Sequence, residues 1–240
     1  MTDTIRLAKL LAGKISCSRS EAEKYIENGF VTVDGIVVEE PGSRVKPDSK
    51  IELLAGAKPV PVEPVTILLH KPAGYDIEKD HEAALRLITP ENQAADDRSG
   101  IRFIKRHLAD LNLTDPLGVQ SSGLVILTQD WRVARKLITD AAKVEQEFIV
   151  DVAGEILPEG LALLNQGIRI NGSLLPVKAS WQNETRLRFA VKGNQRHQIA
   201  SMCERAGLTV LAMKRIRIGR IPLSALQAGQ WRYLLGYEKF

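Results

Sequence analysis

Residues 115–130, DPLGVQSSGLVILTQD, join a loop to a strand that the sequence marks as buried. The Pro-Leu-Gly run and the serine pair predict a loop, and the apolar run that ends in a polar turn predicts a strand inside a sheet. A small polar loop before a buried strand is typical of an active-site rim. Beyond its first residue, Asp115, this loop offers nothing more reactive than a serine. What it can do chemically therefore depends on the rest of the chain.

Strands and helices follow one another irregularly around this stretch. Further strands are predicted within 65–76, 147–156, 186–193 and 208–221, and helices within 131–143 and 195–207. They do not alternate regularly, as the units of a parallel sheet would. The sequence therefore predicts an α+β fold with a mixed, mostly antiparallel sheet and flanking helices.

The first 56 residues predict a small domain of two helices and a hairpin. Apolar residues spaced by three and four within 5–15 predict an amphipathic helix. Ser18 begins a Ser-x-x-Glu capping box, and Asn28-Gly29 is a favourable helix end. Asp34-Gly35 between two β-branched runs predicts a hairpin.

Three prolines within ten residues separate this small domain from the remainder. The stretch 56–65, GAKPVPVEPV, has few residues that could form a core, so we interpret it as a stiff, extended linker. The predicted division is a domain of residues 1–56, a linker of 57–64 and a larger domain of 65–240.

The positive charge is unevenly placed. The formal net charge is only +4, but the segment from Thr185 to Arg220 holds nine Lys and Arg against one acid, Glu204. Such an asymmetry indicates a polyanionic partner or a solubilising face, and charge alone leaves both open.

Cysteine use and hydropathy predict a soluble, cytoplasmic protein. Only Cys17 and Cys203 occur, which excludes a disulfide framework and gives no metal-ligand spacing. The first residues lack the apolar segment of a signal peptide, and no stretch approaches the roughly 18 apolar residues of a membrane span.

Two basic surfaces are candidates for phosphate contact. The first lies on the N-terminal helices and comprises Arg6, Lys9, Ser18, Arg19 and Lys24. The second lies on the strand KRIRIGR, where a period of two places Lys214 on one face and Arg215 with Arg217 on the other. The alternatives are an ordinary solvated helix face and an edge strand guarded by charges.

The N-terminal segment resembles the small RNA-binding domain first known from ribosomal protein S4. The resemblance runs from Arg6 to about Val38 and includes the Ser-Arg-x-x-Ala-x-x-x-Ile pattern that begins at Ser18. It implies RNA as the partner but specifies no reaction.

The remainder resembles the bacterial ribosomal RNA pseudouridine synthases. The motifs are LLHKPAGY (68–75), SSGLVILTQD (121–130), the block 193–219 and LQAGQWRYL (226–234). The resemblance implies binding of structured ribosomal RNA, flipping of a uridine and its isomerisation, in which the base detaches, turns and rejoins through carbon. It implies no cofactor and no metal; we also expect a monomer without a membrane partner.

The resemblance also shows what is missing. The family's loop reads Gly-Arg-Leu-Asp before the Ser-Gly-Leu strand, and its catalytic Asp aligns with Gly118. Glycine has no side chain that could act as nucleophile or base. Phe148 replaces the family's usual Tyr, which keeps a face for stacking on uridine and loses the hydroxyl. The closing helix has Ala200 and Ser201 where the family has two basic residues.

Other family positions keep residues suited to RNA. The resemblance implies a phosphate contact at Lys71 and RNA contacts from Arg196, His197 and Gln198; either Arg196 or His197 would be the basic partner of the lost acid. Two hypotheses follow. One is an RNA-binding relative with impaired catalysis, and the alternative is an active synthase with a displaced acid such as Asp115. An S4-type RNA-binding protein with an unrelated second domain is a third, which the closing block disfavours.

Overall fold

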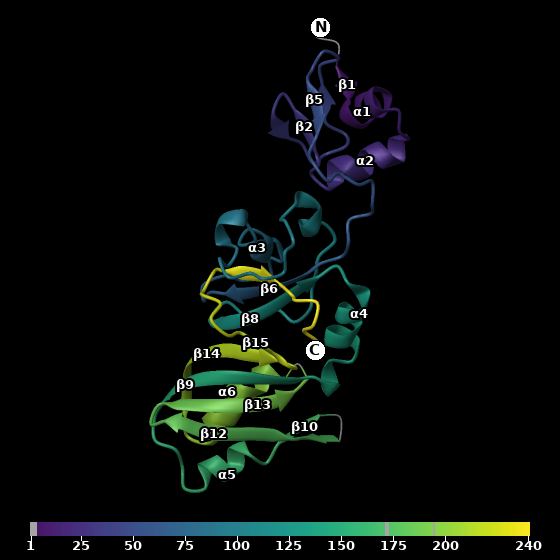
Figure 1. The fold of residues 1–240 in the computed structure, drawn as a ribbon. Coiled ribbons are helices and arrows are strands. Elements are labelled where there is room, and N and C mark those ends of the chain that lie inside the picture. The colour runs from purple at the N-terminus through teal and green to yellow at the C-terminus, as the bar shows by residue number, and fades with distance from the viewer. Residues whose placement is uncertain (1–3, 171–172, 194) are drawn as a thin grey trace. The chain divides into compact units, whose positions relative to one another are not determined.

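The structure, a computed structural model, describes residues 4–170, 173–193 and 195–240 in two compact units. The first unit comprises Met1–Pro64 with Arg102–Asp110, and the second comprises Val65–Ile101 with Leu111–Phe240. Figure 1 shows both as ribbons. No helix in the described part of the chain is both long and apolar enough to cross a membrane.

The first unit has the predicted helix pair and hairpin. Its elements are β1 (Ile5–Arg6), α1 (Leu7–Ile15), α2 (Arg19–Glu27), β2 (Val31–Val33), β3 (Ile36–Val37), β4 (Arg44–Val45), β5 (Ile51–Leu53) and the 3-10 turn η2 (Lys105–Leu108). Ser18 caps α2 and forms the predicted capping box with Glu21. Asp34 and Gly35 both have positive φ, as the tight turn between β2 and β3 requires. Side chains from both helices and β2 form the core.

One segment departs from the predicted division of the chain. Residues 102–110 belong to the first unit, although they lie within the predicted second domain. The Arg102 guanidinium donates a 2.6 Å hydrogen bond to the carbonyl of Gly29, and the backbone N–H of Lys105 donates to the Glu39 carboxylate. These bonds join residues that are more than sixty positions apart in the sequence, so no local pattern could predict them.

The second unit is a mixed sheet with helices, as predicted. Among the described residues, nine strands form one sheet in the order β12-β13-β9-β14-β8-β6-β16, with β15 beside β14 and β7 beside β8. The strands are β6 (Thr66–Lys71), β7 (Asn112–Leu113), β8 (Ser121–Thr128), β9 (Glu145–Ala153), β12 (Val177–Asn183), β13 (Arg186–Lys192), β14 (Thr209–Ile218), β15 (Ile221–Pro222) and β16 (Trp231–Tyr233). The pairing is antiparallel except between β14 and β8.

Short helices and one hairpin accompany this sheet. They are α3 (Glu82–Leu85), η1 (Pro90–Asn92), α4 (Trp131–Ala134), η3 (Arg135–Thr139), η4 (Ala141–Lys143), α5 (Gly160–Leu164) and α6 (Arg196–Arg205), with the hairpin β10 (Ile168–Ile170) and β11 (Ser173–Leu175). The predicted helix at 131–143 therefore exists, but it changes to a π-helical turn at Arg135.

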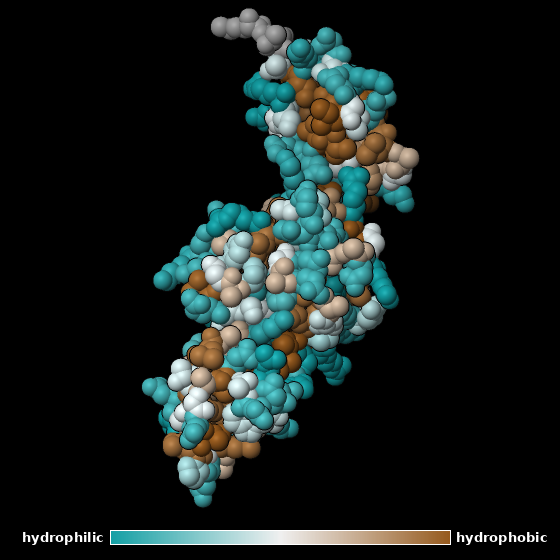
Figure 2. Space-filling view, turned by 90° about the vertical axis from the view of Figure 1, so that its left-hand side faces the viewer, coloured by the Kyte–Doolittle hydropathy of each residue, from teal (hydrophilic) through white to brown (hydrophobic). Residues whose placement is uncertain are grey.

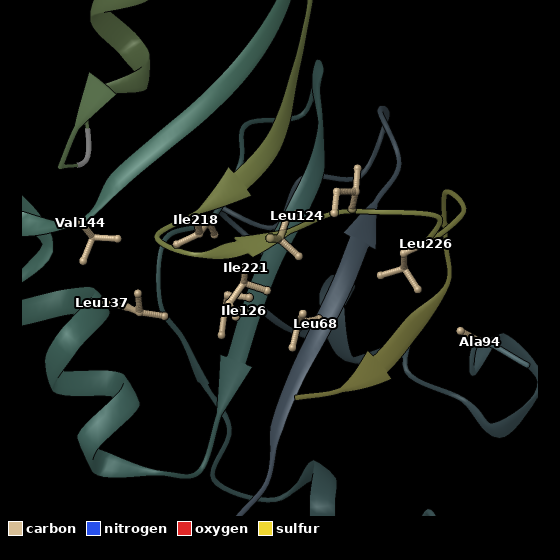
Figure 3. Packing of buried hydrophobic residues seen from close by; sticks show 10 residues of the cluster. Leu68, Ala94, Leu124, Ile126, Leu137, Val144, Ile218, Ile221 and Leu226 are labelled. Carbon is tan, nitrogen blue, oxygen red and sulfur yellow. The ribbon is translucent and has the colours of Figure 1, made fainter. Parts of the chain in front are cut away.

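A hydrophobic cluster lies where β6, β8, β14 and β15 meet. Figure 3 shows Leu68 on β6, Leu124 and Ile126 on β8, and Ile218 and Ile221 at the turn from β14 to β15. Leu137 closes the cluster from the helical side. β6 is buried at every position and β8 along its last six, as the continuous apolar runs in the sequence predict. Figure 2 shows the molecule from another side, with hydrophobic residues interspersed among hydrophilic ones.

A β-bulge in β14 overturns the predicted phosphate clamp. Arg215 pairs with Phe148 on β9, whereas Arg217 pairs with the next residue along, Glu147, because the register shifts at Ile216. One extra residue reverses the alternation of faces. Arg215 and Arg217 therefore lie on opposite faces of the sheet, and the prediction that they project together was wrong.

Candidate functional site

The site is built around Asp115, at the start of the loop between β7 and β8. Its side chain is buried, and each carboxylate oxygen has a partner. Arg196 donates to Oδ1 at 2.5 Å, and Oδ2 accepts from Arg215 at 2.7 Å and from the Gln146 amide at 2.8 Å. A buried carboxylate is stable only with such compensation. Asp115 is therefore fully engaged by protein groups.

Arg215 belongs to the same buried network. It is fully buried, and it donates to the carbonyls of Leu124 and Asp115 as well as to the Asp115 carboxylate. Burial lowers the pKa of Arg215 to about 10, which leaves the guanidinium charged at neutral pH. An RNA contact at Arg215 stays a prediction, and it requires the buried network to open, since its donors face the loop and strand β8.

Arg196, at the start of α6, links two acids. Its side chain is 8% exposed and pairs with both Asp115 and Glu78. His197, the other candidate for the basic partner, lies exposed on α6. Gln198 is also exposed, and it lines a cavity of about 490 Å³ together with Gln166, Ser201 and Arg205.

Gly118 lies beside a carboxylate, that of Glu78, which no sequence motif indicated. A Cβ placed at Gly118 would lie 3.1 Å from Oε2 of Glu78. The side chain of Glu78 is 42% exposed, and its other oxygen, Oε1, accepts a hydrogen bond from Arg196. Glu78 and Gly118 are forty positions apart in the sequence, so no motif connects them.

Lys71 holds the backbone of the loop that contains Gly118. It is fully buried at the end of β6, and its Nζ donates to the carbonyls of Ser121 at 2.6 Å, Pro72 at 3.0 Å and Gly118 at 3.1 Å. Burial lowers the pKa of Lys71 to about 8. The ammonium holds the backbone of the loop and is closed to solvent, so the phosphate contact at Lys71 stays a prediction and requires the loop to open.

Phe148 lies on the same face of β9 as Gln146, two positions away. Its ring is fully buried, and its register partners are Phe189 and Arg215. Stacking of this ring on a uridine stays a prediction, and it requires the ring to become accessible when RNA enters.

Acids from elsewhere in the chain pair with much of the basic segment 185–220. Five of its nine Lys and Arg have ion pairs, namely Arg186 with Asp151, Arg188 with Glu147, Arg196 with Asp115 and Glu78, Arg215 with Asp115, and Arg217 with Glu145 and Glu147. The charge asymmetry in the sequence therefore overstates the positive surface. Lys214 is half-buried and has no ion pair to a described residue.

The predicted N-terminal surface is accessible. Arg6, Lys9, Ser18 and Arg19 are exposed and Lys24 is half-buried. Arg19 makes a solvent-exposed pair with Glu23, which is weak and leaves the guanidinium available. Within the described ranges, no group of three or more His, Cys, Asp or Glu is arranged to hold a metal ion.

Comparison with known proteins accounts for both units. Residues 5–51 match the S4 domain family. A dual-specificity RNA pseudouridine synthase, RluF, of Escherichia coli O6:H1 is 30% identical over 98% of this chain and 77% of the relative. This chain belongs to the bacterial ribosomal RNA pseudouridine synthase family.

Other relatives agree with this membership. The ribosomal small subunit pseudouridine synthase A of Vibrio cholerae is 27% identical over 98% of this chain and 97% of its own length. A putative chloroplast ribosomal large subunit pseudouridine synthase of Arabidopsis thaliana is 32% identical, and the match spans 55% of that longer protein. The crystal structure of a pseudouridylate synthase shares the fold, with a TM-score of 0.57 at 22% identity over 96% of both chains.

Family membership gives the site its orientation. The motif segments of residues 68–75, 121–130 and 193–219 meet around the loop that starts at Asp115. Lys71 and the buried arginines hold the loop in place from two sides. The side chain of Glu78, which accepts a hydrogen bond from Arg196 of this network, lies partly exposed beside Gly118.

Proposed function

We propose that this chain binds structured ribosomal RNA through its S4 unit and presents a uridine to the surface at Gly118, and that the loop of residues 115–118 supplies no catalytic acid. The observation that carries the proposal is the combination of an intact S4 match with a network of Asp115, Arg196 and Arg215 closed within the protein. Action in the cytoplasm as a monomer stays a prediction, as does the ribosomal RNA target.

The buried network argues against the displaced-acid hypothesis in its original form. Asp115 has two guanidinium partners and an amide partner, so approach by a ribose would require breaking buried ion pairs. Removing one partner of such a pair costs about 3–5 kcal/mol. Asp115 therefore fits a structural role, which leaves impairment as the expectation unless another carboxylate reaches Gly118.

RNA affinity is expected to depend steeply on salt. In a filter-binding assay with transcribed ribosomal RNA, the Arg6→Ala/Lys9→Ala variant should bind about tenfold more weakly than wild type. The slope of the logarithm of the binding constant against the logarithm of the salt concentration should become shallower by about 1.5, because each lost phosphate contact accounts for roughly 0.7–0.9 of it. A matched control, Lys58→Ala/Lys178→Ala, removes two exposed lysines outside the predicted surface and should leave both values unchanged.

The salt series also tests the proposal itself. The measurement covers about 50 to 200 mM salt, where release of counterions from phosphates dominates the affinity. An affinity that stays flat across this range would remove RNA binding from the function of the chain. Equal losses in the test and control variants would remove the N-terminal helices from the footprint.

A further inference from the structure

We propose that Glu78 is the catalytic carboxylate of this chain and takes the place of the acid that Gly118 lacks. The inference rests on the proposed function, since it requires that ribosomal RNA brings a uridine to this surface. It differs from the sequence-based alternative, which placed the displaced acid at Asp115.

Position is the first argument. Oε2 of Glu78 lies 3.1 Å from the point where the Cβ of a residue at 118 would sit. A carboxyl group at 118 would begin one bond of about 1.5 Å beyond that Cβ. The Glu78 carboxylate therefore occupies the neighbourhood that an aspartate side chain at 118 would fill. It enters that space from the segment between β6 and α3.

Availability is the second argument, and it separates the two acids near the loop. Asp115 is buried with both oxygens bonded to protein donors. The side chain of Glu78 is 42% exposed, and the described residues donate a hydrogen bond to Oε1 but none to Oε2. One oxygen is thus held by protein, and the other, beside Gly118, accepts no hydrogen bond from a described residue, as a group that must touch a substrate requires.

Electrostatics is the third argument. The guanidinium of Arg196 is 8% exposed and contacts the carboxylates of Asp115 and Glu78, so the buried Asp115 holds it in place. A buried cation that donates a hydrogen bond to a partly exposed carboxylate fixes the orientation of that carboxylate. A second cation, the ammonium of Lys71, donates a hydrogen bond to the carbonyl of Gly118 itself.

The reaction needs no co-reactant, and one carboxylate has a defined task in it. The N1–C1′ bond of uridine breaks, and its electron pair leaves with the uracil ring. The ring turns, the C5–C1′ bond forms, C5 loses a proton and N1 gains one, so atoms and electrons balance. A carboxylate facing the ribose stabilises the electron-deficient C1′ while the ring is detached. Oε2 of Glu78 would face the ribose of a uridine seated at Gly118.

The experiment removes the carboxylate at position 78 and restores one at position 118. Wild type, Glu78→Gln, Glu78→Gln/Gly118→Asp and the control Glu82→Gln are incubated with transcripts of unmodified ribosomal RNA, and pseudouridine is mapped by chemical sequencing. Glu82 is an exposed acid on α3, close in sequence and outside the network. Melting curves and RNA retention are recorded for every variant.

The expected result has three parts. Glu78→Gln should lower the rate by at least about 100-fold while retaining RNA, because glutamine keeps the size and loses the charge. The double variant should recover at least about tenfold of that loss, since the carboxylate returns from position 118. Glu82→Gln should match wild type. A purely structural role for Glu78 would not be rescued from position 118.

Two results would overturn the assignment. One is a Glu78→Gln rate within about threefold of wild type. The other is a silent wild type, whatever the variants do. RNA retention then separates the failures: a silent wild type that still binds RNA refutes the role of Glu78 and leaves the proposed RNA-binding function standing. A wild type that binds no RNA refutes the proposed function as well.

Discussion

Replacing Asp115 with alanine is expected to lower the free energy of unfolding by about 3–5 kcal/mol. The substitution leaves the fully buried guanidinium of Arg215 without its counter-ion and takes one of two partners from Arg196. An uncompensated buried charge costs far more than the ion pair itself contributes. The measurement is urea-induced unfolding, followed by circular dichroism.

Arg217→Ala is the matched control for this prediction. Arg217 also pairs with two acids, Glu145 and Glu147, but its side chain is 25% exposed and lies on the other face of the sheet. Water can replace those partners, so the loss should stay below about 1 kcal/mol. If Asp115→Ala were as stable as wild type and also lost pseudouridine formation, Asp115 would be the displaced acid and the structural role would fall.

Replacing Gly123 with alanine is expected to destabilise the second unit by about 3 kcal/mol or more. Gly123 has a φ of +113° within β8, a conformation that strains any residue with a Cβ. The added Cβ would also lie 2.2 Å from the carbonyl oxygen of Arg215 on the parallel strand β14. The two backbones would have to separate at the position where Arg215 enters the buried network.

The control for this prediction is Gly236→Ala. Gly236 belongs to the same unit, has no atom within 4 Å of an added Cβ and does not lie in the left-handed region. Its substitution should change the free energy of unfolding by less than about 0.5 kcal/mol. Both variants are measured by the same denaturant titration, and equal losses would show that the close approach of β8 and β14 has no energetic consequence.

Local chemistry made much of the fold predictable. The capping box at Ser18 needs only a partner three residues away, and the Asp34-Gly35 turn needs only two residues that tolerate positive φ. The hydrophobic pattern predicted α6 and five strands, β6, β8, β9, β13 and β14, and it missed β12 and the shorter strands β7, β10, β11 and β16. The family was likewise recognisable from motifs that are contiguous in the chain.

The face of a side chain was predictable only while the strand stayed regular. Period two placed Arg215 and Arg217 together, and the bulge at Ile216 separated them. The residues Lys214–Arg217 look the same in a bulged strand and in a regular one. The bulge arises where β14 pairs with β9 on one side and with β8 on the other.

The sequence by itself determined the α+β class, the S4 segment, the family and the absence of an acid at Gly118. Only the tertiary structure decided which charges are internal and which face solvent. Asp115 forms ion pairs with Arg196 and Arg215, which are 81 and 100 residues away in the sequence. Glu78 lies beside Gly118 although the two are on different segments of the chain. Burial and pairing depend on distances in space, and these are set by how the strands pack rather than by spacing along the chain.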